Sequence, residues 1–208
     1  MKPPRAPRQP EAVVEESRPP APGALELVRS FINSRNVERG TDSIDSAAGL
    51  TAWLRERGLL DPATEATEED VVRALQVREV LRAFCLRNNG LDCACDARVL
   101  NAAAERSGLL LAFEAGGDCS FRPRQPCVDG AIGVLLAEVH RSMLDRSWAK
   151  LKACADPTCL WAYYDRSKNG CSRWCNAGLC GNRDKVKRFR ERQALANSPQ
   201  VIDNLAGQ

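Results

Sequence analysis

Four cysteines in the last third of the chain have the spacing of a metal site. Cys154, Cys159, Cys175 and Cys180 form the pattern C-x4-C-x15-C-x4-C in this 208-residue sequence. Two thiolate pairs with short internal spacing can close a tetrahedral four-sulfur shell around Zn²⁺. Because four thiolates leave no coordination position for water, the site is expected to be structural rather than catalytic. We therefore predict one structural Zn²⁺ bound by these four cysteines.

A basic segment follows the last of these cysteines. Residues 181–193 carry six Lys or Arg side chains, and only Asp184 and Glu191 dilute this charge. The segment has the pattern of a helix that begins near Cys180, and Val186 and Phe189 are expected to pack onto aromatic side chains before it. Such dense charge of one sign favours a polyanion partner over a merely solvated helix.

Eight side chains in and before this helix are candidates for contact with nucleic acid. Phosphate contacts would supply affinity, and base recognition would need a few residues at the exposed edge of the helix. Asn182 and Arg183 are chemically able to read bases, but either could instead brace the zinc loop. The candidates are Arg173, Asn182, Arg183, Lys185, Lys187, Arg188, Arg190 and Arg192.

Charge is divided unevenly along the chain. Residues 146–193 hold twelve Lys or Arg and four acidic side chains, whereas residues 24–145 hold fourteen basic and nineteen acidic ones. An acidic body joined to a basic C-terminal module indicates two functions in one polypeptide.

The remaining candidate chemistry is limited to thiols. Cys93 and Cys95 form a C-x-C pair in a loop, and Cys171 lies four residues before a predicted zinc ligand, so these three are candidates for a redox role. The single histidine, His140, has no second ligand at metal spacing, and motifs of hydrolases or nucleotide-binding enzymes are missing from the sequence. We therefore expect a protein that is not an enzyme.

The pattern of apolar residues predicts a mainly α-helical body with one β-hairpin. Helices are expected from residue 24, after a cap at Asp45 or Ser46, from a Thr67-x-x-Asp70 box, after Asp96, and over residues 129–148. Residues 109–122 read as a hairpin with a glycine turn. Beyond residue 148, the segments 160–165 and 172–175 could pair as two strands before the basic helix. The predicted fold class is thus α+β, with a small treble-clef-like module at the C-terminal end.

Two segments of the chain resemble known families. The segment "CADPTCLWAYYDRSKNGCSRWCNAGLCGNRDKVKRFRER" closely resembles the CGNR zinc finger, which is named for the run that here begins at Cys180. Upstream, "ALELVRSFINSRNVERGTDSIDSAAGLTAWL" resembles the ABATE domain that usually precedes this finger. The resemblance implies a bacterial transcription regulator whose finger binds DNA. Two departures are Cys171, where a polar residue is usual, and Ser172, where an Arg that could contact phosphate is frequent.

These observations predict the domain organisation and the partners. We expect a disordered Pro-rich tail at 1–23, an ABATE-like domain at 24–148, the zinc finger at 149–194 and a flexible tail at 195–208. DNA is the expected partner, and the helical domain is expected to sense a small-molecule ligand or to form a homodimer. The alternative is a zinc-stabilised module that binds protein or RNA. No apolar stretch of membrane-spanning length occurs in the sequence, and a cytoplasmic location is expected.

Overall fold

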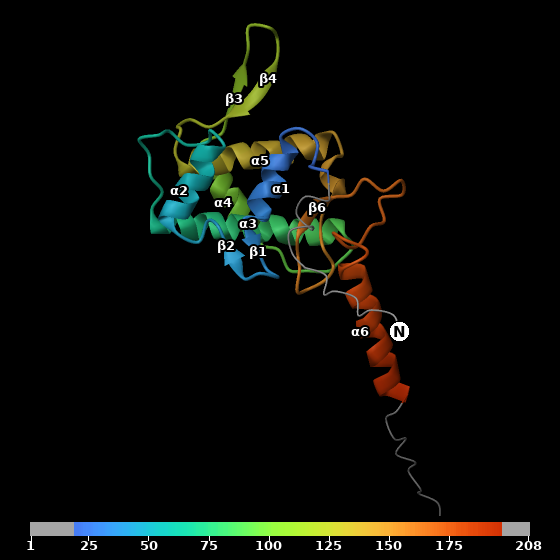
Figure 1. The fold of residues 1–208 in the computed structure, drawn as a ribbon. Coiled ribbons are helices and arrows are strands. Elements are labelled where there is room, and N and C mark those ends of the chain that lie inside the picture. The colour runs from blue at the N-terminus through green and yellow to red at the C-terminus, as the bar shows by residue number, and fades with distance from the viewer. Residues whose placement is uncertain (1–18, 197–208) are drawn as a thin grey trace, which may run out of the picture.

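Helices make up most of the regular secondary structure (Figure 1). The computed structural model describes residues 19–196, so most of the two predicted tails lies outside the described residues. No helix within that range is both long and apolar enough to cross a bilayer. The elements in chain order are α1 (Leu25–Ile32), β1 (Arg35–Asn36), β2 (Thr41–Asp42), α2 (Ala47–Glu56), α3 (Glu68–Asn88), α4 (Ala97–Ser107), β3 (Leu110–Phe113), β4 (Cys119–Arg122), α5 (Val128–Leu144), the 3-10 turn Trp148–Lys150, β5 (Leu151–Ala153), β6 (Ala162–Tyr164) and α6 (Cys180–Ala196).

Three helices begin at the residues that the sequence indicated. The Ser46 hydroxyl accepts a hydrogen bond from Gly49 N at the start of α2. Thr67 and Asp70 form a reciprocal capping box at the start of α3, and the Asp96 carboxylate accepts from a backbone N–H in the first turn of α4. Each cap satisfies an N–H that the helix itself leaves without a partner and stabilises the helix by about 1 kcal/mol.

The hydrophobic core lies between α1, α3 and α5 and extends into the C-terminal module. Val28, Leu81 and Leu135 on these helices are fully buried. Leu151 of β5 and Ala162 of β6 belong to the same buried cluster. The strands next to the cysteines therefore pack as part of the helical body.

Asparagine side chains also join the helical body to these strands. Asn33, at the end of α1, exchanges two hydrogen bonds with the backbone of Ala162, at 2.8 and 2.9 Å. Asn89, at the end of α3, donates to the carbonyls of Ala153 and Arg173, both at 2.8 Å. Because both asparagines satisfy backbone groups of the C-terminal module, they fix its position on the body.

The hairpin beside the cysteines differs from the prediction. The antiparallel partner of β6 is β5, with Ala153 opposite Ala162, and residues 172–175 form no strand. The Asp165 carboxylate accounts for the difference, since it accepts hydrogen bonds from the backbone N–H groups of Ser167 and Ser172. A side chain thus holds the segment that was expected to pair as a strand.

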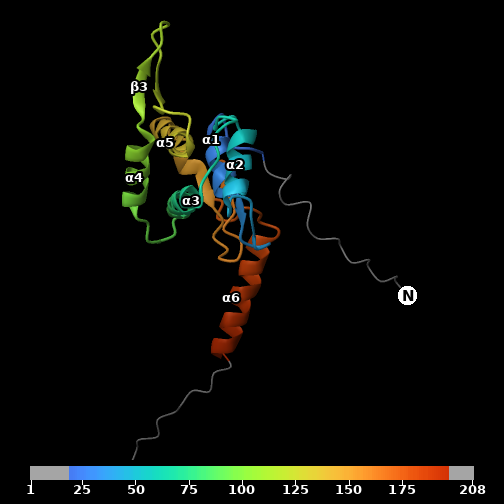
Figure 2. The same ribbon diagram turned by 90° about the vertical axis from the view of Figure 1, so that its left-hand side faces the viewer.

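Two elements project from the helical body. The predicted hairpin is present as β3 and β4, with Phe113 opposite Cys119, and it extends away from the helices. Helix α6 leaves the body in a different direction, as both views show (Figures 1 and 2). The body therefore leaves most of the length of α6 available to a partner.

Candidate metal centre and basic helix

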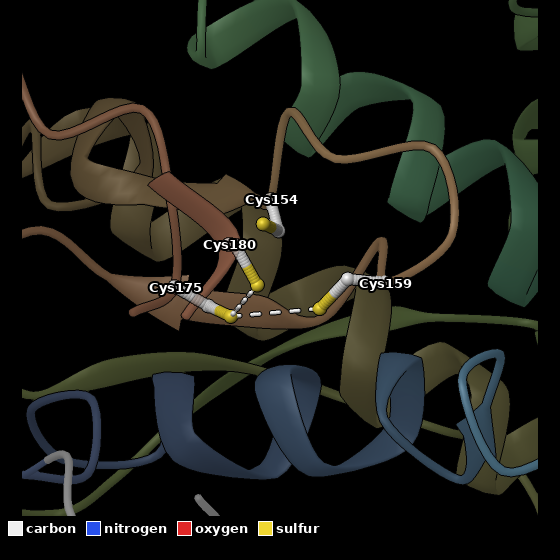
Figure 3. A group of neighbouring side chains, drawn as sticks. All are labelled: Cys154, Cys159, Cys175 and Cys180. Atoms are coloured by element: carbon white, nitrogen blue, oxygen red, sulfur yellow. Dashed lines mark hydrogen bonds between the residues drawn. The ribbon is translucent and has the colours of Figure 1, made fainter. Parts of the chain in front are cut away.

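The four predicted zinc ligands converge on one point (Figure 3). Cys154 follows β5, Cys159 precedes β6, Cys175 lies in the loop before α6, and Cys180 is the first residue of α6. All four are buried, and their Sγ atoms lie within 4.8 Å of one another. Within residues 19–196 this is the only group of three or more potential metal ligands that the structure brings together.

The spacing of the sulfur atoms fits a tetrahedral Zn²⁺ site. A Zn–S bond of about 2.3 Å places the corners of a tetrahedron about 3.8 Å apart. The Sγ atom of Cys175 lies 3.5 Å from that of Cys159 and 3.6 Å from that of Cys180. The donor set is four thiols, which favour Zn²⁺ over oxygen-seeking cations. The cluster is therefore consistent with one Zn²⁺.

Each cysteine pair is shaped by a polar side chain between its two members. Asp156 accepts hydrogen bonds from the backbone N–H and the hydroxyl of Thr158, and its carbonyl accepts from Cys159 N at 3.0 Å. In the second pair, Asn176 Oδ1 accepts from Gly178 N and Leu179 N. These tight turns direct both thiols of a pair toward the same point.

Hydrogen bonds among the thiols separate their pKa values. Those from Cys154, Cys159 and Cys175, together with one from Arg183, hold the pKa of Cys180 far below its ordinary value. Hydrogen bonds with Cys154, Cys159 and Cys180 raise the pKa of Cys175, and burial and charge repulsion from Cys154 raise it further. A divalent cation would remove this repulsion and favour four thiolates, so the chemistry of the cluster also fits Zn²⁺.

Arg183, predicted as a candidate for DNA contact, has three acceptors within the protein. Its Nη2 donates to Cys180 Sγ at 3.1 Å and its Nε to Asp156 Oδ2 at 2.8 Å, while Nη1 donates to Glu38 of the helical body. The hydrogen bond to Glu38, followed by the one to Cys180, raises the pKa of Arg183 above its ordinary value. Arg183 thus links a metal-site thiol, the first cysteine turn and the body.

Replacing Arg183 by Gln is expected to weaken zinc binding. An outer partner of a metal ligand typically contributes about 10- to 100-fold in metal affinity. Competition against a chromophoric chelator would measure the loss, with Arg190→Gln as a matched control because Arg190 is exposed on the same helix. Equal affinities for the two variants would contradict this role of Arg183.

A buried ion pair supports the same region. Lys152 Nζ donates to Asp165 Oδ2 at 2.8 Å, and both residues are buried. Burial alone would raise the pKa of Asp165, but the hydrogen bonds from Lys152 and Ser167 outweigh it and hold that pKa below its ordinary value. Lys152 also donates to the Gly170 carbonyl, so the pair ties β5 to the loop before Cys175. No local pattern in the sequence predicts this pair.

The basic side chains of α6 are exposed along the projecting helix. Both acids pair one turn away, Asp184 with Arg188 and Glu191 with Lys187. Since the described part of α6 has six basic and two acidic residues, the helix stays strongly positive. All eight candidates for nucleic-acid contact are exposed: Arg173, Asn182, Arg183, Lys185, Lys187, Arg188, Arg190 and Arg192.

Val186 and Phe189 do not pack as predicted. They are 43% and 54% exposed, respectively, because α6 extends away from the strands. The aromatic side chains that were expected to cover them, Trp161 and Trp174, pack against the cysteine cluster instead. A shallow pocket beside α6 is lined in part by Val186.

The three candidate redox cysteines lie outside the metal cluster. Cys93 and Cys95 occupy the loop between α3 and α4, and Cys171 is exposed before Cys175. All three are free thiols. Their redox role stays a prediction.

The fold and the cysteine cluster define a zinc-finger protein with a helical N-terminal domain. Comparison with known families shows that residues 150–193 match the CGNR zinc finger. Residues 12–146 match the ABATE domain, described as "Putative stress-induced transcription regulator". Because this second match covers more than half of the chain, the protein belongs to the ABATE family and carries a CGNR zinc finger. A comparison with curated proteins gave no match.

Proposed function

We propose that this protein is a zinc-dependent DNA-binding transcription regulator whose helix α6 contacts duplex DNA. The observation that carries the proposal is the geometry of α6: its first turn is anchored by Cys180 and Arg183, the helix extends beyond the body (Figure 1), and its basic side chains are exposed. In this proposal Cys154, Cys159, Cys175 and Cys180 bind one Zn²⁺, which fixes where the helix begins and in which direction it points.

The dimensions of α6 suit a DNA groove. A helix of 17 residues is about 25 Å long, and the major groove of B-DNA, about 12 Å wide, admits an α-helix. Phosphate contacts from the exposed surface of the helix would come from Lys185, Lys187, Arg188, Arg190 and Arg192. Arg173 and Asn182 would contact DNA near the N-terminal end of α6. The three internal acceptors of Arg183 support a bracing role for that residue.

Removing charge from α6 should reduce the salt dependence of DNA binding. Each phosphate contact contributes about −0.9 to the slope of log K against log salt. The Lys187→Ala/Arg188→Ala/Arg190→Ala variant is therefore expected to lower the magnitude of the slope by roughly 3. Fluorescence anisotropy with a labelled duplex at several salt concentrations measures this slope.

The matched control removes the same charge from the body. Arg98, Arg122 and Arg124 are exposed outside α6, and their triple alanine variant should keep the wild-type slope. A reduced slope in the control, or an unchanged slope in the α6 variant, would contradict the proposal.

A second candidate function is a zinc-stabilised module that binds protein or RNA. The exposed apolar pair Val186 and Phe189, of which Val186 lines the shallow pocket, favours a protein partner. Mobility shifts with random duplex DNA, single-stranded DNA and RNA at two salt concentrations separate these functions. Preference for duplex supports the first proposal, preference for RNA supports the RNA variant, and no shift with any of the three supports a protein partner.

The helical domain is proposed to sense a ligand or to mediate dimerisation. One small recognition module buries only about 600–1,000 Å² on DNA, so a second copy would add specificity. The β3–β4 hairpin supports a dimer contact, because an isolated two-stranded hairpin is marginal in water and this one exposes Leu111, Phe113 and Phe121.

As a transcription regulator of the bacterial type, the protein is expected to act in the cytoplasm.

Polar substitution on this hairpin should shift a dimer toward monomer. Leu111→Ser/Phe113→Ser removes two exposed apolar side chains from the proposed contact and leaves the buried core unchanged. Analytical ultracentrifugation is expected to show a dimer for the wild type and at least about tenfold weaker association for the variant, since a loss of 1.4 kcal/mol is tenfold. A wild-type monomer at all concentrations would refute the proposed contact.

A further inference from the structure

Two thiols share the loop that joins α3 to α4. Cys93 and Cys95 lie within residues 91–96, a segment without regular secondary structure, and both side chains are partly accessible. A C-x-C pair in an irregular loop can bring its sulfur atoms together by local adjustment of the backbone. The pair lies outside the zinc cluster and has no part in the function proposed above.

A hydrogen bond from Arg87 distinguishes Cys95 from the other described thiols outside the zinc cluster. Arg87 lies in the last turn of α3, and its Nη1 donates to Cys95 Sγ at 3.0 Å. A guanidinium beside a thiol favours the thiolate, which is the form that attacks peroxides. The contact with Cys95 also raises the pKa of Arg87, so the cation persists at all relevant pH.

Cys93 has the features of the second thiol of such a pair. Its Sγ donates to the Ala83 carbonyl at 3.1 Å, and burial raises its pKa, with a further increase from Cys95. A protonated thiol reacts slowly with peroxide but can condense with an oxidised neighbour. The two cysteines thus differ in the way that a reacting and a resolving thiol differ.

The loop directly follows the turn of α3 that holds the zinc finger. Asn88 donates to the carbonyls of Trp148 and Leu151, and Asn89 donates to those of Ala153 and Arg173. Arg87, which contacts Cys95, therefore directly precedes in sequence the two residues that attach the finger to the body.

We propose that Cys95 and Cys93 form a hydroperoxide-oxidisable dithiol whose disulfide loosens the attachment of the zinc finger to α3. The Cys95 thiolate attacks one peroxide oxygen, so that an S–O bond forms, the O–O bond breaks, and the other oxygen leaves with a proton as water or an alcohol. The Cys93 sulfur then attacks the sulfenic sulfur, forming the S–S bond. The hydroxyl group leaves with the Cys93 proton as water. Two electrons pass from the dithiol to the peroxide.

Peptide mapping of the full-length, zinc-loaded protein tests the reaction. Trypsin releases Asn88–Arg98, which contains Cys93 and Cys95 and no other cysteine, and Ser107–Arg124, which contains only the exposed Cys119. During titration with hydrogen peroxide, the first peptide should lose its free thiols about tenfold faster than the second, because a guanidinium donates to the Cys95 sulfur. Equal rates would overturn the proposal.

Two variants test the assigned roles. Cys93→Ser should leave a Cys95 sulfenic acid that dimedone traps, with no disulfide in the peptide. Arg87→Gln, read on the longer peptide Ala83–Arg98, should slow oxidation of Cys95 about tenfold, since the variant removes the guanidinium that donates to its sulfur. Unchanged oxidation in Arg87→Gln would contradict the role of the guanidinium.

Hydrogen exchange tests the effect on the finger. In the oxidised wild-type protein, amides of residues 151–153 and 173–175 should exchange faster than in the reduced protein, because the asparagine contacts open more often. The Cys93→Ser protein under the same peroxide treatment is the control and should show no such increase. Exchange that is the same in oxidised and reduced wild type would overturn the loosening.

Discussion

Replacing Cys175 by Ser is expected to abolish stoichiometric zinc binding and to unfold the segment from residue 154 to the start of α6. The Sγ atom of Cys175 lies within 3.6 Å of the Sγ atoms of both Cys159 and Cys180, so the variant loses a ligand that contacts two of the other three sulfur atoms. Zinc bound to four thiolates contributes about 10–16 kcal/mol of apparent binding free energy in small fingers, which is also folding free energy. The finger has few other buried apolar residues of its own, because its buried cluster consists of the four cysteines and Tyr163.

Metal analysis and thermal unfolding together measure this effect. Wild-type protein should contain one zinc per chain and the variant close to none, with a lower unfolding temperature. Cys171→Ser is the matched control, because Cys171 is exposed and stands outside the cluster. Stoichiometric zinc in Cys175→Ser, or loss of zinc in Cys171→Ser, would contradict the proposed ligand set.

Replacing Asp165 by Asn is expected to lower the free energy of unfolding by about 3–5 kcal/mol, since it leaves the buried Lys152 ammonium without its counter-charge. The carboxylate accepts from Lys152 and from the N–H groups of Ser167 and Ser172, so the variant also weakens the loop before Cys175. Chemical denaturation of the zinc-loaded protein measures the change.

The pH dependence of the same variant gives an independent check. Because the pKa of Asp165 is lower in the folded protein than in the unfolded chain, its stabilising contribution is present above the unfolded value and is lost as pH falls through the folded value. Wild-type stability should therefore decline in acid more than that of Asp165→Asn.

The double variant Lys152→Met/Asp165→Asn should recover part of the unfolding free energy that Asp165→Asn loses. No recovery would contradict an effect of the unpaired charge.

Features set by nearby residues could be predicted from the sequence. Ser46, the Thr67 and Asp70 box and Asp96 lie within four residues of the N–H groups they cap, so their patterns indicated the helix starts. The cysteine quartet could be predicted because metal geometry restricts ligand spacing.

Features that depend on distant residues could not be predicted. The pairing of β6 with β5, the contact of Arg183 with Glu38 and the hydrogen bonds of Asn33 to Ala162 join segments whose proximity no local pattern encodes. The exposure of Val186 and Phe189 was missed for the same reason. Their i, i+3 spacing predicts a shared face but does not reveal whether another element covers it.

The central claim is that α6, positioned by the cysteine cluster, is the part of the protein that touches DNA. Site-specific photocrosslinking tests it directly, with p-benzoylphenylalanine introduced as Lys187→Bpa on α6 and as Arg98→Bpa on α4 as the control, each exposed. With zinc-loaded protein and a labelled duplex, crosslinks are predicted from position 187 and not from position 98, and chelation of zinc should remove them. Crosslinks from position 98 alone, or crosslinks from position 187 that persist without zinc, would contradict the claim.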